Sequence, residues 1–154
     1  MEIEYLCDHI DIADTVARWI YEAFIAGIRD DLSYEDLLTA IKKCHRQELP
    51  IRLITFVDGK CAGTVSLVLN DLKCRAYSPW LAALYVDKRY RSQGIGERLV
   101  NAVINIAQEL GHERLYLRTE HASDYYRKLG WDFVETCEDD FDLKPYVFVL
   151  ELLL

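Results

Sequence analysis

The sequence predicts one domain of mixed α/β class, for three reasons. The chain has 154 residues, 51% of them hydrophobic and 12% aromatic, which suffices for a single compact core. Segments whose apolar residues recur at helical spacing alternate with short β-branched segments, so helices and strands are interleaved. Two glycines one residue apart follow the strand-like segment that ends at Val86, and a helical pattern begins there. We therefore expect residues 1–154 to form one domain with a sheet flanked by helices.

The N-terminal third predicts a short strand and two helices. Residues 3–7 alternate apolar and polar side chains, as a strand does. Ser33 and Asp36 have the spacing of a capping box, so a second helix starts there and continues through Ile41. The first helix is expected to bury one face, made of Ile12, Val16, Trp19, Ile20, Ala23, Phe24 and Gly27.

The rest of the chain predicts most of the sheet. Asp58 and Gly59 supply a hairpin turn between two antiparallel strands. A helix from Ile95 to about Leu110 joins two later strands, which are therefore parallel, and a short helix follows at 122–129. The expected strands are 51–57, 61–69, 81–86, 115–117, 131–135 and 146–153.

Composition argues against several classes of protein. The net charge of −8 and the pI near 5.0 disfavour a nucleic-acid binder and suit a cationic partner. The five cysteines form no Cys-x-x-Cys pair and no zinc spacing, so we expect no metal site and reduced thiols in the cytoplasm. The N-terminus lacks the pattern of a secretory signal, and no apolar run nears the roughly 20 residues that span a membrane. Either a monomer or a homodimer is compatible with the sequence.

The glycine loop is the strongest candidate for a binding site. Free N–H groups at the start of a helix attract anions, and Arg91 adds positive charge. Glu97 and Arg98 stand where a P-loop has Lys and Ser or Thr, and Leu99 replaces the third glycine of a dinucleotide fingerprint. The glycines therefore serve either another anion or only a turn.

Two motifs of the chain, and the order in which they occur, resemble the GNAT superfamily of N-acyltransferases. Arg-x-x-Gly-x-Gly at 91–96 resembles its acyl-CoA pyrophosphate loop, and residues 126–131 resemble its Tyr-x-x-Leu-Gly-Phe/Tyr signature. The resemblance implies a mostly antiparallel sheet in which the parallel fourth and fifth strands splay apart. It also implies an acetyl-CoA-dependent N-acetyltransferase, in which a primary amine of a small molecule or peptide attacks directly in a ternary complex.

The resemblance also implies which residues hold acetyl-CoA. The end of the fourth strand would pair with the pantetheine arm, and the glycine loop would hold the pyrophosphate. Thr119 replaces the usual asparagine of the family and puts one pantetheine contact in doubt. The implied cofactor-binding residues are Leu84, Tyr85, Val86, Arg91, Ser92, Gln93, Gly94, Ile95, Gly96, Glu97, Thr119 and Tyr126.

Amine acylation needs a neutral amine and a proton for the departing thiolate. Tyr126 matches the family tyrosine and is the expected proton donor, with packing as the alternative. Residues 80–84 lack the strand glutamate of many relatives, so a water relay is expected, with Glu120 or His121 near it. His121 as an exposed loop residue, and Trp80 as either pocket or core, remain open.

Acidic segments flank the expected acceptor cleft. They are either ordinary solvated surface or a recognition site for a cationic amine such as a polyamine, an aminoglycoside or a basic peptide. A non-catalytic acyl-CoA-binding module, motivated by the missing glutamate, is the alternative function, and a purely structural partner protein is a third. The acidic residues are Asp30, Asp31, Glu35, Asp36, Glu138, Asp139, Asp140 and Asp142.

Overall fold

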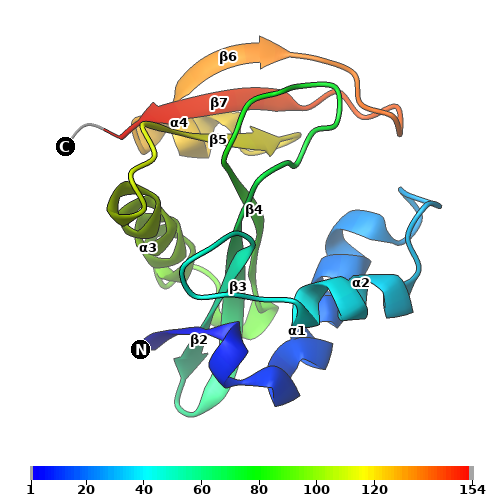
Figure 1. Ribbon diagram of the computed structural model, residues 1–154, viewed down its shortest axis with the longest axis vertical. Coiled ribbons are helices and arrows are strands. Elements are labelled where there is room, and N and C mark those ends of the chain that lie inside the picture. Colours follow the sequence, from blue (N-terminus) through cyan, green and yellow to red (C-terminus); the bar gives the residue numbers. More distant parts are fainter. Residues whose placement is uncertain (1, 153–154) are drawn as a thin grey trace.

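The computed structural model describes residues 2–152 and contains one sheet of seven strands. Its strand order is β1-β2-β3-β4-β5-β7-β6, so β7 lies between β5 and β6 (Figure 1). All neighbouring pairs are antiparallel except β4 and β5. The strands are β1 Glu2–Tyr5, β2 Ile51–Val57, β3 Lys60–Val68, β4 Trp80–Val86, β5 Arg114–Thr119, β6 Asp132–Thr136 and β7 Tyr146–Glu151.

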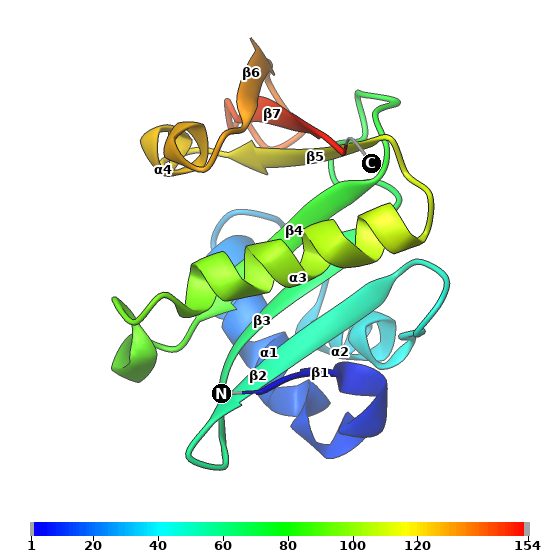
Figure 2. The same cartoon turned by 90° about the vertical axis from the view of Figure 1, so that its left-hand side faces the viewer.

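The helices lie on both faces of the sheet. The N-terminal pair α1 and α2 packs on one face, and α3 runs across the other (Figures 1 and 2). The Ser33 capping box is present at the start of α2, as predicted. The α-helices are α1 Ala13–Ile20, α2 Tyr34–Lys42, α3 Ile95–Glu109 and α4 Ser123–Lys128, and the other helical turns are η1 Leu6–Asp8, η2 Ile10–Ile12, η3 Tyr21–Ile25 and η4 Lys88–Tyr90.

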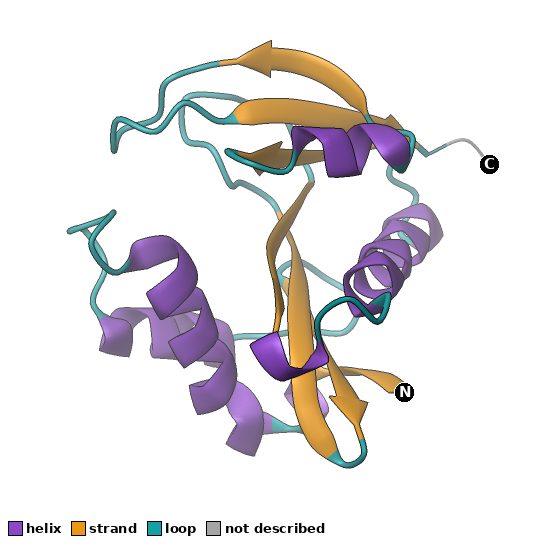
Figure 3. Ribbon diagram, turned by 180° about the vertical axis from the view of Figure 1, so that it is seen from behind, coloured by secondary structure: helices purple, strands orange, loops and turns teal. Residues whose placement is uncertain are grey.

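The sheet opens between β4 and β5. These strands are parallel, as predicted, but among the described residues only Trp80 and Tyr116 are paired across them. Beyond this pair the strands diverge, and β5–β7 with α4 form a separate arm above the first four strands (Figure 3). The strand edges past Trp80 therefore face a gap instead of each other.

Gly63 allows α3 to pack closely on the sheet. A Cβ atom there would lie 3.0 Å from the carbonyl oxygen of Tyr85 and 3.1 Å from Cδ1 of Leu99. Both distances are tighter than ordinary contacts, so a side chain would push α3 or β4 away. This close approach fixes α3, and with it the glycine loop at its start, against β3 and β4.

The first helix differs from the prediction after Ile20. The chain continues as a π-helical turn, Tyr21–Ile25, whose extra residue rotates the side chains that follow. Ile25 is consequently buried, with 3% of its surface exposed, whereas Phe24 is 43% exposed. The prediction of a single buried face through Phe24 and Gly27 is therefore wrong. It assumed α-helical spacing beyond Ile20, where the chain forms a π-helical turn instead.

Smaller differences concern strand ends. The first strand stops at Tyr5, and Leu6 and Cys7 belong to η1. The predicted end of the last strand at Leu153 lies outside the described residues.

Two of the cysteines, distant in the sequence, lie close together in the fold. All five are free, yet Sγ of Cys7 lies 2.8 Å from Sγ of Cys44. In residues 2–152 no three His, Cys, Asp or Glu side chains gather as metal ligands. Among the same residues, each helix is too short or too polar to cross a membrane.

Candidate active site

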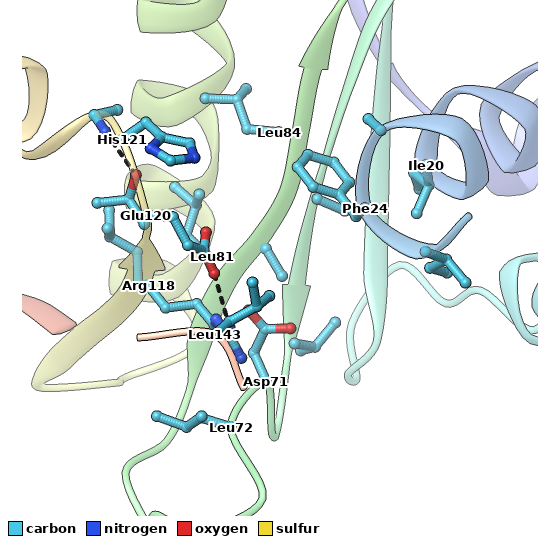
Figure 4. Close-up of a pocket in the computed structure, with 18 of the residues that line it drawn as sticks. Ile20, Phe24, Asp71, Leu72, Leu81, Leu84, Arg118, Glu120, His121 and Leu143 are labelled. Carbon is cyan, nitrogen blue, oxygen red and sulfur yellow. Dashed lines mark hydrogen bonds and ion pairs between the residues drawn. The ribbon is translucent and has the colours of Figure 1, made fainter. Parts of the chain in front are cut away.

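The gap between β4 and β5 contains one large cavity. Its volume is about 1180 Å³, comparable to the upper end of sites for small ligands. The glycine loop and α4 line one end, and η3, the β3–β4 loop and the β6–β7 loop line the other. We call the part lined by the glycine loop and α4 the glycine-loop end, and the part lined by η3 and the two loops the acidic end. Figure 4 shows the acidic end, with Leu84 and His121 lying toward the glycine-loop end.

The glycine loop is held open by a local network. Asp87 accepts a hydrogen bond from the backbone N–H of Arg89 at 2.9 Å and so caps η4. Arg91 donates from Nε to the carbonyl oxygen of Val86 at 2.9 Å, and its guanidinium lies over the ring of Tyr85. Gly94, with φ of 77°, is the left-handed residue from which α3 begins.

The loop presents a row of unused donors. Within residues 2–152, no protein atom accepts a hydrogen bond from the N–H groups of residues 92–97. Gly96 has no side chain that could block a ligand from these N–H groups. The protein itself does not require glycine there, since a Cβ would lie 3.7 Å or more from other protein atoms. Open N–H groups at a helix N-terminus suit a phosphate or pyrophosphate.

A bulge in β4 leaves backbone groups free beside the cavity. Ser66 pairs with Ala82 and Thr64 with Tyr85, so two residues of β4 oppose one of β3. Ala83 has φ of 55°, a left-handed conformation that is rare for a non-glycine residue. Within the part of the chain that the structure describes, Leu84 has no register partner in β3 or β5, so the edge of β4 at this residue is open to a ligand.

Tyr126 is held in the wall of the glycine-loop end. It is 7% exposed and packs edge-to-face against Trp131, with ring centroids 6.0 Å apart. Burial raises the pKa of its phenol to about 12, with a smaller contribution from Tyr125. The phenol therefore stays protonated throughout the neutral range.

An ion-pair network organises the acidic end. Arg118, on β5, donates to Glu120 and to Asp139, each at 2.8 Å. Asp139 also accepts from the backbone N–H groups of Phe141 and Leu143 at 2.8 and 2.9 Å. Burial opposes ionisation of Asp139, but these hydrogen bonds outweigh it and lower its pKa. Asp139 therefore fixes the β6–β7 loop against β5.

The family of the chain follows from its match to known proteins. Residues 13–131 match the model of the acetyltransferase (GNAT) family. The chain belongs to the GNAT acetyltransferase family. This match confirms three predictions made from the sequence: the family, the acyltransferase class and the fold.

Individual relatives of this GNAT chain are distant. It is 32% identical over 82 residues to the Arabidopsis thaliana N-alpha-acetyltransferase MAK3, an alignment that spans 51% of this chain and 43% of that protein. An aminoglycoside 6'-N-acetyltransferase solved with coenzyme A has a TM-score of 0.77 at 16% identity, covering 100% and 98% of the two chains. A GNAT acetyltransferase from Streptococcus pneumoniae has a TM-score of 0.70 at 22% identity, covering 99% and 100%. These structures show that the fold is shared.

Most residues that the GNAT resemblance implied do line the cavity. Tyr85 and Gln93 are exceptions, and Tyr85 instead stacks on Trp19, with ring centroids 5.4 Å apart. The Thr119 hydroxyl accepts from the N–H of Ala122 at 3.0 Å, so it caps the turn before α4. The implied residues at the cavity are Leu84, Val86, Arg91, Ser92, Gly94, Ile95, Gly96, Glu97, Thr119 and Tyr126, and His121, expected near a water relay, lines it as well.

The structure separates the acidic residues by role. Asp140 lines the cavity, whereas Asp31 pairs with Arg29 at 2.9 Å and Asp36 belongs to the capping box. Trp80 is fully buried beneath the acidic end and is core, not pocket. The acidic residues away from the cavity lining are Asp30, Asp31, Glu35, Asp36, Glu138 and Asp142.

Two charged residues of the cavity were not predicted from the sequence, where only Arg118 has a weak signal. Asp71 follows β3 in a loop that has the composition of an ordinary turn, and Arg118 lies within a short strand. Both line the acidic end. Alternation along residues 114–119 places Arg118 opposite the buried face of β5 and was the one usable clue.

Proposed function

We propose that this chain is an N-acetyltransferase that uses acetyl-CoA to acetylate a primary amine of a small molecule or peptide. The amine attacks directly while both substrates are bound. The observation that carries the proposal is the junction of two features along one cavity, the open N–H row of residues 92–97 and the unpaired backbone of Leu84. One suits a pyrophosphate and the other suits an amide-bearing arm lying along β4.

The donor set of the cavity fits acetyl-CoA, whose thioester supplies the acetyl group. Residues 92–97 would hold the pyrophosphate through backbone N–H groups, with Arg91 beside them. The carbonyl of Val86 is already bonded to Arg91, so the free groups of Leu84 are the better partners for pantetheine. In the proposed reaction the Leu84 N–H also stabilises negative charge on the carbonyl oxygen.

Tyr126 is the proposed proton donor to the sulfur. Its pKa of about 12 keeps the proton available at any pH at which an amine is acetylated. Residues 80–84 supply no ionisable side chain, and Glu120 is bonded to Arg118, which leaves water for removal of the amine proton. His121 lines the cavity at the glycine-loop end and is the proposed partner of that water.

A second candidate function is a non-catalytic acyl-CoA-binding module. The missing strand glutamate favours it, since such a module needs the anion site but no base. Either protein would work as a monomer or homodimer, and the free cysteines suit the cytoplasm, where we place it.

The decisive experiment measures thiol release from acetyl-CoA with a panel of alkylamines, polyamines, aminoglycosides and short peptides, with mass spectrometry of the product. An acetylated amine formed at a rate above that of the buffer supports the transferase. CoA-dependent thermal stabilisation without turnover on any amine supports the binding module. If the protein shows neither turnover nor CoA-dependent stabilisation, both functions are excluded.

A further inference from the structure

Asp71 is a half-buried acidic residue of the cavity without a protein partner among the described residues, whereas Glu97 and Asp140, which also lack one there, are exposed. Within residues 2–152 the Asp71 carboxylate forms no hydrogen bond and no ion pair, whereas Glu120 and Asp139 are both bonded to Arg118. Figure 4 shows Asp71 beside Leu72 at the acidic end, away from Leu84 and His121. A carboxylate left without a donor at a cavity wall is available to a ligand.

Asp71 is held in place by both of its neighbours. The side chain of Asn70 accepts a hydrogen bond from the N–H of Leu72 at 3.1 Å, which forms a tight turn. Leu72 is 2% exposed and packs with Trp80 and Val147. The carboxylate is thus presented by an anchored turn, which suits a positioned contact.

The two cations that act on Asp71, Arg118 and Arg29, are already paired with other carboxylates. Arg118 is matched by two carboxylates, and Arg29 is matched by Asp31 at 2.9 Å. Lys73 and Arg52 also line the cavity, and neither forms an ion pair with Asp71 among the described residues. The charged groups near Asp71 are Arg118 from β5, Glu120 just after β5, Arg29 from the segment after η3 and, bonded to Arg118, Asp139 from the β6–β7 loop.

An apolar channel connects Asp71 to the glycine-loop end. Ile20 and Phe24 line one side of it, and Leu81 and Leu143 line the other (Figure 4). Asp71 follows β3 just past the pairing of Val68 with Trp80, and Leu84 lies four residues further along β4. At about 3.3 Å per residue, Trp80 and Leu84 are about 13 Å apart along β4, which sets the scale of the distance between the two ends of the cavity.

We propose that Asp71 binds a second ammonium group of the acceptor, so that the preferred substrates are long aliphatic diamines or polyamines. This inference rests on the proposed transferase function and names its substrate class. The apolar channel takes the methylene chain, and the distal amine reaches the glycine-loop end, where it is acetylated. A polyhydroxylated amine would leave its hydroxyl groups facing Ile20, Phe24 and Leu81 without partners, which is unfavourable.

Proton binding to Asp71 provides an independent signal. Burial and the nearby charge of Glu120 raise the pKa of Asp71 to about 6, against the opposing effects of Arg118 and Arg29. Below this pH the carboxyl is neutral, and above it the group is an anion. An alkylammonium keeps its charge over this range, so the attraction should grow as the pH rises through 6.

The test compares 1,8-diaminooctane with octylamine, which differ only in the second amine. We expect kcat/KM to be at least about tenfold higher for the diamine, the value of one hydrogen bond to a charged group. The advantage should disappear for 1,4-diaminobutane, whose chain is too short to reach both ends. It should also decrease below pH 6.

Asp71→Asn should reduce the ratio of kcat/KM for diamine over monoamine about tenfold and make the ratio independent of pH. Asp30→Asn is the matched control, since it removes one negative charge from an exposed position outside the cavity lining. Its ratio should equal that of the wild type. Because each ratio is taken within one protein, partial loss of folding cancels.

Three results would overturn the inference, and a fourth would reject the function on which it rests. Equal kcat/KM for diamine and monoamine in the wild type would mean that no second ammonium group is bound, with the transferase function intact. A ratio that survives Asp71→Asn would place the second site elsewhere. If only short peptides are acetylated, the substrate is a peptide N-terminus and not a diamine. If no amine of the panel is acetylated, the transferase function itself is rejected.

Discussion

The two ends of the cavity are built in different ways. The anion site of the glycine-loop end consists of backbone groups from one continuous stretch, where η4, residues 92–94 and the start of α3 follow each other. The acidic end consists of side chains from four separate segments, joined by bonds such as Arg118 to Asp139, which are 21 residues apart. One end depends on local conformation and the other depends on tertiary contacts.

This difference suggests how the family can hold one co-substrate and vary the other. Backbone N–H groups are present whatever the side chains are, so the glycine-loop end tolerates many sequences. The acidic end changes with each substitution in a loop, because charged side chains supply its contacts. Substitutions at the two ends should therefore separate binding of acetyl-CoA from binding of the amine.

The largest effect is expected for Tyr126→Phe, which keeps the buried ring and removes the proton donor. We expect kcat to decrease about 10²- to 10⁴-fold, the usual contribution of general acid catalysis, with unchanged affinity for CoA. The neighbouring Tyr125→Phe is the control and should leave kcat near that of the wild type. Normal turnover in Tyr126→Phe would mean that Tyr126 only packs.

Gly94→Glu should abolish CoA binding, with Kd raised more than about a hundredfold, because several charge-assisted hydrogen bonds are lost and a like charge is added. Calorimetry measures the change. The substitution also strains a left-handed residue, so Gly111→Glu is the matched control, with φ of 85° and open space around it. Gly94→Glu with normal CoA affinity would place the anion site elsewhere.

Asp139→Asn should affect the amine and spare the co-substrate. Loss of the ion pair to Arg118 loosens the β6–β7 loop, and we expect KM for the amine to rise about tenfold with unchanged Kd for CoA. Asp142→Asn in the same loop is the control, since Asn tolerates its φ of 61°. A parallel loss of CoA affinity would show that the two ends are coupled.

The smallest effect is expected for Asp140→Asn. Its carboxylate lines the cavity, is exposed and forms no ion pair within residues 2–152, so it acts only through a screened field. KM for a polycationic amine should rise no more than about threefold at low salt, and the difference should vanish near 0.5 M salt. An unchanged KM at low salt would make this residue ordinary surface.

The elements that could be predicted depend on residues close together in the chain. The capping box of Ser33, the hairpin turn at Asp58 and the glycine loop each need only a few neighbouring positions, and all are present. The parallel pairing of β4 and β5 follows from the helix between them.

The features that were missed depend on distant contacts or on a local exception. Nothing in the residue type of Asp71 distinguishes a cavity carboxylate from a turn residue, since its role is set by Arg118 and the apolar channel. The bulge at Ala83 has no glycine to mark it, and the π-turn at Tyr21–Ile25 interrupts a helical pattern that continues in sequence. Tertiary packing decides each of these cases.

If the proposed function holds, the single pair between β4 and β5 in the described structure gives acetyl-CoA a second role. A ligand arm that bonds to β4 fills part of the opening in the sheet and ties the β5–β7 arm to the first four strands. Any ligand that binds only the folded chain raises its stability by mass action, by about 2.7 kcal/mol at a hundred times its Kd. Resistance of the protein to proteolysis would then follow the supply of acetyl-CoA, so that a cell short of this metabolite would also hold less of the enzyme that consumes it.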